Sequence, residues 1–169
     1  MVKMRRWIAI LFIIYILYLI WAVLFKFSFS YSEIPFRRQA VNLDPFYLLR
    51  GSYISPFIIR EKVMNIIIFI PFGAYLYLLG QKKFVPNFLI MMLTSILFEI
   101  IQFSFSLGTC DVADVLTNVI GGVFGYLLTY FTLRISNREE RMMRHFTVLS
   151  SVITTVVIAG TLWLKVKYG

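Results

Sequence analysis

Long apolar segments separated by short polar stretches dominate the pattern of hydrophobic and polar positions along this chain. Each reaches or nearly reaches the roughly 20 residues that an α-helix needs to cross a hydrocarbon core of about 30 Å. The segments cover residues 7–25, 63–80, 85–107, 112–131 and 146–164. The pattern predicts an all-α fold: a polytopic bundle of about five transmembrane helices, in one domain over residues 1–169, multi-pass in the cell membrane. The first segment exceeds a signal-peptide core in length, so we expect it to stay as a helix.

Composition supports this prediction and narrows the partners. The chain is 60% hydrophobic, with a mean hydropathy of +0.82. A net charge of +9 would suggest nucleic acid in a soluble protein, but here the basic residues flank the apolar segments, where they meet anionic headgroups. We therefore expect membrane lipids, and no nucleic acid, as partners. The single cysteine, Cys110, provides no disulfide and no zinc or iron–sulfur spacing, and no cofactor is expected.

The distribution of basic residues predicts the orientation. Lysine and arginine are denser in residues 3–6, 82–83 and 134–144 than in the alternate segments, which favours a cytoplasmic N-terminus. Residues 26–62 then form an extracellular loop. This loop is rich in phenylalanine and tyrosine, so we expect it to pack on the helix ends at headgroup level. Its Asn42–Phe46 stretch is typical of a fixed turn.

A polar stripe follows the third segment. Ser95, Glu99, Gln102 and Ser106 are spaced by four, three and four residues, which places them on one helix face. A carboxylate at the centre of a bilayer costs about 2.5 to 3.5 kcal/mol on insertion scales, so intramembrane acids mark functional sites by default. We therefore predict that this face meets another helix or a cavity.

The fourth segment carries a matching stripe. Asp111, Asp114 and Asn118 are spaced by three and four residues, and the stripe continues to Gly121 and Gly125, whose spacing lets a neighbouring helix approach closely. The turn over residues 108–111 is short. The third and fourth helices should therefore be antiparallel neighbours with their stripes facing each other.

These residues should converge at the outer leaflet. Asn65 and Arg60 lie at the outer end of the second segment, and Arg60 is the best counter-charge for the acids in the pattern. The candidate ligand-binding residues are Asn42, Arg60, Asn65, Glu99, Gln102, Asp111, Asp114 and Asn118.

Chemistry leaves several roles open for the carboxylates. Glu99 and Asp114 with amide oxygens could hold Ca²⁺ or Mg²⁺, which prefer oxygen ligands. A protonated Glu99 could donate or relay a proton. The stripe could also accept hydrogen bonds from the ammonium, hydroxyl or amide groups of a lipid-linked ligand. The alternative to all three is interhelical hydrogen bonding with no ligand, at about 0.6 kcal/mol per bond. The sequence carries no Ser-His-Asp set, zinc spacing or phosphate-binding glycine loop.

An ordered series of motifs at these residues resembles the VanZ family. The series runs Trp21-Ala22-Val23-Leu24-Phe25-Lys26, Asn42-Leu43-x-Pro45-Phe46, Asn65-x-x-x-Phe69-x-Pro71-Phe72-Gly73, Phe98-Glu99-x-x-Gln102-Phe103 and Asp111-x-x-Asp114-Val115-x-x-Asn118-x-x-Gly121-x-x-x-Gly125. Many members carry an arginine just before the first aspartate, where this chain has Thr109-Cys110. The resemblance implies a membrane protein that reduces the action of teicoplanin or lipoglycopeptide antibiotics on the Gram-positive cell envelope.

Four functional hypotheses follow from residues and resemblance together. In the first, the outer polar site engages an envelope lipid, a lipid-linked cell-wall precursor or the lipid tail of the antibiotic, and binding alone suffices. In the second, a membrane enzyme modifies a lipid headgroup with Glu99 or Asp114 as acid, base or metal ligand. The third is a small proton-coupled transporter, for which five helices are few unless the protein forms a homo-oligomer. The last is an accessory subunit without chemistry of its own.

Overall fold

The computed structural model describes residues 2–24, 40–45, 56–80, 82–135, 148, 155 and 159 of the chain. Within these residues lie the helices α1 (Val2–Leu24), α3 (Pro56–Leu79), α4 (Phe84–Ser104) and α5 (Val112–Ile135). All four are long and apolar enough to cross a membrane. The predicted fifth span over 146–164, apart from residues 148, 155 and 159, and most of the aromatic-rich loop over 26–62 fall outside the described residues.

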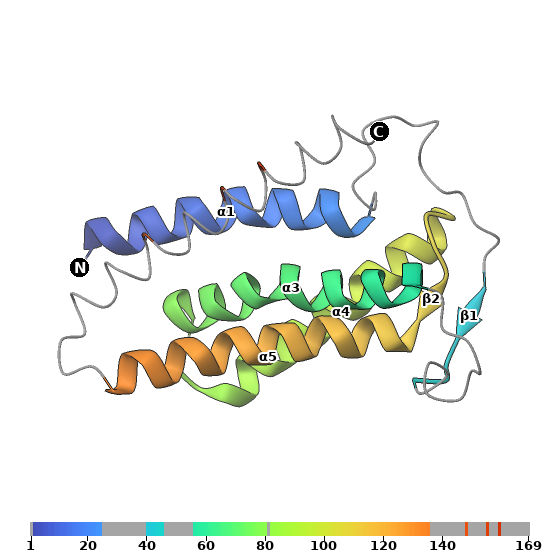
Figure 1. The fold of residues 1–169 in the computed structure, drawn as a ribbon. Coiled ribbons are helices and arrows are strands. Elements are labelled where there is room, and N and C mark those ends of the chain that lie inside the picture. Colours follow the sequence, from blue (N-terminus) through green and yellow to red (C-terminus); the bar gives the residue numbers. More distant parts are fainter. Residues whose placement is uncertain are drawn as a thin grey trace.

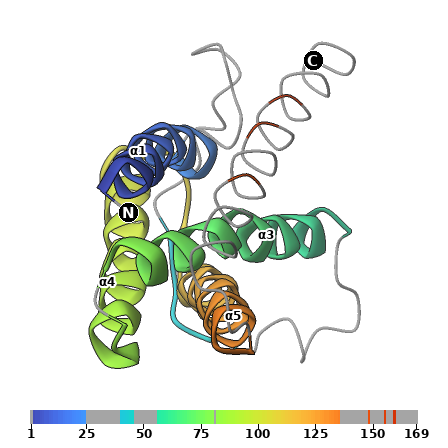
Figure 2. The same ribbon diagram turned by 90° about the vertical axis from the view of Figure 1, so that its left-hand side faces the viewer.

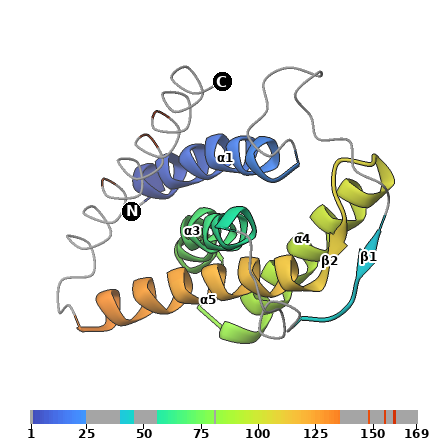
Figure 3. The ribbon, with the colours of Figure 1, turned by 45° about the vertical axis from the view of Figure 1, so that its right-hand side comes forward.

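Helix α3 is the centre of the bundle. It contacts α1, α4 and α5, and its contact with α5 is the most extensive in the described fold. Figures 2 and 3 show α3 passing between α1 and α5. α1 and α4 run in one direction and α3 and α5 in the other (Figure 1). The C-terminal ends of α1 and α4 therefore share one end of the bundle with the N-terminal ends of α3 and α5.

A short parallel strand pair lies at that shared end of the bundle (Figure 1), which we call the strand end. β1 (Val41–Asn42) pairs with β2 (Cys110–Asp111), with Asn42 opposite Asp111. The Cys110 amide also donates to the Ala40 carbonyl at 2.9 Å. The pairing fixes part of the segment between α1 and α3 against the turn that leads into α5.

α3 begins earlier than the hydropathy pattern predicts. The expected span started at Val63, but the helix starts at Pro56, where the fixed φ of proline suits the first turn. The charged residues 60–62 are therefore helical rather than part of a loop. The helix continues through Pro71, and the Tyr15 hydroxyl of α1 donates to the Ile68 carbonyl one turn earlier.

α4 ends at Ser104, three residues before the predicted end at Leu107. The Leu107 amide donates to the Gln102 carbonyl at 2.8 Å and the Ser106 amide to the Phe103 carbonyl at 3.1 Å. This pair of bonds is a Schellman motif, in which the residue after the cap adopts a left-handed conformation. Ser106 takes that place with a φ of 55°. The spacing had predicted that Ser106 extends the polar stripe of α4. This prediction is wrong, because Ser106 lies in the turn after the helix.

Small residues set the distance between α3 and α5. A Cβ added to Gly121 would overlap the carbonyl oxygen of Ile66, and one added to Gly125 would overlap that of Ile70. From the other side, a Cβ on Gly73 would overlap the carbonyl oxygen of Gly122. The close approach predicted from the glycine spacing is confirmed, and its partner is α3.

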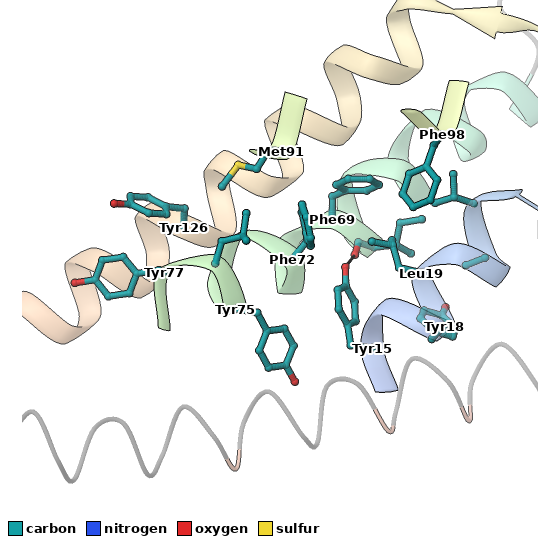
Figure 4. Close-up of a cluster of buried hydrophobic side chains, with 14 of the residues drawn as sticks. Tyr15, Tyr18, Leu19, Phe69, Phe72, Tyr75, Tyr77, Met91, Phe98 and Tyr126 are labelled. Atoms are coloured by element: carbon teal, nitrogen blue, oxygen red, sulfur yellow. Dashed lines mark hydrogen bonds between the residues drawn. The ribbon is translucent and has the colours of Figure 1, made fainter. Parts of the chain in front are cut away.

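Aromatic side chains of α3 fill the interior of the bundle (Figure 4). Phe69 and Tyr75 are both 0% exposed. The Phe69 ring meets Phe98 of α4 edge-to-face with centroids 6.2 Å apart, and Tyr75 lies 5.5 Å from Tyr15 of α1. These contacts join α1, α3 and α4 in one cluster, and such ring pairs contribute about 0.5 to 1.5 kcal/mol each beyond area burial.

The outer faces of the helices are apolar. Leu17 of α1 is 64% exposed and Leu93 of α4 is 62% exposed, whereas Glu99 is only 3% exposed. A soluble bundle shows the opposite distribution, with charges outside and leucine inside. Exposed apolar faces around buried polar groups are the distribution expected of helices in lipid.

Candidate functional site

Lys62 is the central cation of a buried polar cluster at the strand end. Its Nζ lies 2.6 Å from Asp111 Oδ2 and 2.8 Å from Asp114 Oδ1. Its side chain is 8% exposed, and the two aspartates are 7% and 11% exposed. A buried charge needs a partner of opposite sign, and here the ammonium group and the two carboxylates compensate one another's charge. The sequence pattern had suggested Arg60 for this counter-charge; the structure gives the role to Lys62.

Asp111 connects α5, β1 and α4 through its side-chain oxygen Oδ1 and its backbone N–H. As the residue before α5, it caps the helix, because its Oδ1 accepts the Ala113 amide at 2.9 Å. The side-chain amide of Asn42 in β1 donates to the same oxygen at 3.4 Å. Its own backbone N–H donates to Glu99 Oε2 of α4 at 2.8 Å. A change at this position would therefore affect the helix cap, the strand pair and the contact with α4 together.

Asp114 lies in the first turn of α5 and takes two donors from α3. Besides Lys62 Nζ, the Asn65 Nδ2 group donates to Asp114 Oδ1. Lys62 and Asn65 are three residues apart, so they share one helix face that points at the start of α5. A carboxylate at a helix N-terminus is also favoured by the helix dipole.

The two predicted stripes face each other, as the spacing indicated. Asn118 Nδ2 of α5 donates to Ser95 Oγ of α4 at 2.9 Å, and Glu99 receives the Asp111 amide one turn closer to the strand end. Gln102 faces a different neighbour, because its Nε2 donates to the Val23 carbonyl of α1 at 2.8 Å. α4 thus carries polar side chains that bond to both α1 and α5.

A cavity of about 120 Å³ opens within this polar cluster. Part of its wall is apolar, from α1 and from Met64 and Ile68 of α3. The polar lining residues are Arg60, Glu61, Asn65, Glu99, Gln102, Asp114 and Asn118. Arg60 is exposed and Glu61 is half-buried, so these two residues form the mouth, whereas Glu99 and Asn118 are buried at the inner end.

Most of the predicted site residues lie together. Six of the eight line the cavity, namely Arg60, Asn65, Glu99, Gln102, Asp114 and Asn118. Asp111 and Asn42 lie behind them and bond to each other. Lys62 was missed as a site residue because it precedes the predicted span and was counted with the loop. The sequence did contain a signal for Lys62 as a site residue. Lys62 lies three residues before Asn65, and that spacing places both residues on one helix face.

The arrangement of acidic residues bears on the metal role predicted for Glu99 and Asp114. The part of the chain that the structure describes has no group of three or more histidine, cysteine, aspartate or glutamate residues arranged around one ion. The position between Asp111 and Asp114 is filled by the Lys62 ammonium group. The predicted Ca²⁺ or Mg²⁺ role for Glu99 and Asp114 thus gains no support from this geometry.

Comparison with known proteins gives the family. A family model described as VanZ/LLP1 matches residues 12–134, which include α3 and α4 completely, α5 except for its last residue and the second half of α1. The chain belongs to the VanZ/LLP1 family. Protein VanZ from Enterococcus faecium is similar to this chain, with 32% identity over 157 residues that cover 92% of each protein. No solved structure gives a significant match. The polar cluster lies within the residues that the VanZ family model covers, and its helices have the character of membrane spans.

Proposed function

We propose that this VanZ-family protein reduces the susceptibility of a Gram-positive cell to teicoplanin and related lipoglycopeptide antibiotics. It does so by engaging an envelope lipid, a lipid-linked wall precursor or the antibiotic at the polar cavity. The family membership and the similarity to Protein VanZ support the antibiotic part of the proposal. Binding alone is sufficient for this role, and no cofactor is required.

The single observation that carries the site is the cavity itself. Its buried wall includes Glu99 and Asn118, and its mouth lies among the first turns of α3. Polar walls around a cavity are not needed for helix packing, because interhelical polar contacts can close on each other directly. With the N-terminus in the cytoplasm, as the basic residues indicate, the mouth opens at the outer leaflet, where wall precursors and the antibiotic are found.

Glu99 supports a second candidate function, a lipid headgroup enzyme. Only its Oε2 is engaged, by the Asp111 amide, while the side chain also lines the cavity. A carboxyl group beside a bound headgroup can act as general acid or base. This candidate requires that expression of the protein changes the lipid mass profile of the host, which binding does not.

The test is teicoplanin susceptibility of a sensitive Gram-positive host that expresses the wild type, Glu99→Gln or Asn118→Leu at matched membrane levels. Thr129→Val is the matched control, because Thr129 is also fully buried on α5 but bonds only to the Gly125 carbonyl, away from the cavity. Protection by the wild type and the control, lost in the two cavity variants, is expected. Protection that persists in both cavity variants would rule out the cavity, and a wild type that gives none would rule out the proposed function.

A further inference from the structure

Each amide group around the cavity uses one of its two N–H donors on the protein itself. Asn65 Nδ2 donates to Asp114, Gln102 Nε2 to the Val23 carbonyl and Asn118 Nδ2 to Ser95. Lys62 Nζ is likewise held between two aspartates behind the wall. The second N–H of each amide makes no hydrogen bond with a described residue, so the donors alone do not select a ligand.

Two acceptors of the cavity wall make no hydrogen bond with a described residue. Asn118 Oδ1 is fully buried and has no hydrogen-bond partner, although the residue is only 1% exposed. Glu99 accepts the Asp111 amide with Oε2. Its other oxygen, Oε1, makes no hydrogen bond with any described residue. A buried acceptor without a partner is costly, so this site gains from a ligand that brings donors. The unpaired Asn118 oxygen does not depend on the acidic residues, and it too favours a ligand that brings hydrogen-bond donors.

Charge adds a second requirement. Asp111 and Asp114 hold the Lys62 ammonium group between them, and Glu99 adds a third buried carboxyl group, bonded to the Asp111 amide. At the mouth, Arg60 and Glu61 contribute one charge of each sign. The carboxylates thus outnumber the cations around the inner cavity, and a ligand with a positive charge is favoured over a neutral or anionic one.

Size limits the ligand further. The cavity has about 120 Å³, somewhat less than the roughly 150 Å³ of an engineered cavity that holds benzene. A sugar ring with its hydroxyl groups or a dipeptide is too large to enter completely. A group of three or four heavy atoms with a terminal nitrogen fits.

We infer that the cavity binds a primary ammonium group on a short aliphatic arm, such as the aminoethyl group of an ethanolamine headgroup. The three N–H donors of the ammonium group bond to Glu99 Oε1, Asn118 Oδ1 and a further acceptor of the wall. The methylene groups pack against the apolar side formed by Met64 and Ile68. A quaternary ammonium group carries the same charge but no N–H donor, so choline is a weak ligand. This inference rests on the proposed function, because it names the ligand chemistry of the same cavity.

The test uses the purified full-length protein in detergent and measures binding of lipids with identical short chains. Dioctanoyl phosphatidylethanolamine is expected to bind about tenfold more tightly than dioctanoyl phosphatidylcholine. This ratio corresponds to the cost of leaving about one buried acceptor without a hydrogen bond. Free ethanolamine as a competitor identifies the source. If free ethanolamine displaces the lipid at a concentration similar to that of the lipid, the site binds a soluble amine. If displacement needs far more ethanolamine, the site binds a lipid headgroup. Equal affinity for the two lipids would overturn the inference, as would displacement of the ethanolamine lipid by Mg²⁺ alone.

Variants connect the preference to the residues. Asn118→Leu should abolish the preference for ethanolamine, whereas Asn118→Asp should keep it, because the carboxylate retains the acceptor and can take a hydrogen bond from Ser95. Thr129→Val is the folding-matched control and should behave as the wild type. A preference that survives in a folded Asn118→Leu protein would contradict the assignment.

The binding test and the susceptibility test are independent. Selective ethanolamine binding by a protein that gives no protection would refute the proposed function and leave the ammonium site in place. Protection by a protein that binds both lipids equally would refute the ammonium site and leave the proposed function in place.

Discussion

Lys62 Nζ lies 2.6 Å from Asp111 Oδ2, a contact that joins the second turn of α3 to the residue that caps α5. The two side chains are 8% and 7% exposed, and they are separated by 49 positions in the sequence. A buried ion pair of this kind gives little net stability compared with apolar packing, but the loss of one partner leaves an uncompensated charge. Lys62 is therefore the residue whose removal should do most damage to the strand end of the bundle.

Lys62→Met should lower the free energy of unfolding by about 3 to 5 kcal/mol, because Asp111 and Asp114 are left buried without their counter-charge. The measurement is unfolding of the purified protein in mixed micelles with increasing denaturing detergent. Lys83→Met is the matched control, since Lys83 is exposed at the start of α4 and its change should stay within about 0.5 kcal/mol. Equal stabilities of the two variants would show that the Lys62 pair has no structural role.

Gly121→Ala should destabilise the fold by about 1 to 3 kcal/mol, because the added methyl group overlaps the backbone carbonyl of Ile66 and must push α3 and α5 apart. Its neighbour provides a control on the same helix. A Cβ at Gly122 would lie 2.9 Å from Met91 Sδ, in the outer half of a flexible side chain that can adjust more easily than a backbone carbonyl. The same unfolding assay should therefore rank Gly122→Ala as the milder variant, and the reverse order would contradict the close α3–α5 contact.

The sequence pattern predicted the parts of the fold that depend on local periodicity. Hydropathy located four helices that the structure also has, and the spacing of Ser95, Glu99 and Asn118 correctly indicated that α4 and α5 bond through their polar faces. The Gly121 spacing correctly indicated a close helix contact. These features follow from residues on one helix, so one sequence is enough to find them.

Features that depend on tertiary partners were not predicted. The charges of residues 60–62 resemble the end of a span, and only the distant aspartates make Lys62 acceptable inside helix α3. The left-handed Ser106 lacks the glycine that normally marks such a turn, so Leu107 was assigned to the helix. Two-residue strands such as β1 and β2 are too short to leave an alternating pattern.

Ser106→Gly should stabilise the protein by about 0.5 to 1 kcal/mol. A φ of 55° is strained for serine and free of strain for glycine, and the gain exceeds the extra entropy that glycine loses on folding. Ser104→Gly provides the opposite case, because Ser104 is the last helical residue of α4. Glycine at this position should lower the free energy of unfolding by roughly 0.5 kcal/mol. Differential scanning fluorimetry distinguishes them, and a lower melting temperature for Ser106→Gly than for Ser104→Gly would contradict the turn geometry.

The orientation can be tested with two cysteine variants in a Cys110→Ser background. Phe105 is 67% exposed after the end of α4, at the strand end, and Lys83 is exposed at the opposite end of the same helix. A membrane-impermeant maleimide added to intact cells should label Phe105→Cys, and should label Lys83→Cys only after permeabilisation. The reverse pattern would place the cavity mouth in the cytoplasm and contradict an outer-leaflet site.

Cys110 provides a prediction about pH. Burial raises the pKa of its thiol, and the neighbouring carboxylates of Glu99 and Asp111 raise it further. Because the thiolate is the reactive form, alkylation of Cys110 should be slow at pH 7.5 and should still be increasing with pH where an exposed cysteine has reached its plateau. The comparison is Leu43→Cys in a Cys110→Ser background, since Leu43 is 70% exposed beside β1. Iodoacetamide rates measured from pH 7 to 10 give both midpoints. Steric protection alone would lower the Cys110 rate at every pH without moving its midpoint, so coincident midpoints would show that neither burial nor the carboxylates raise the pKa of this thiol.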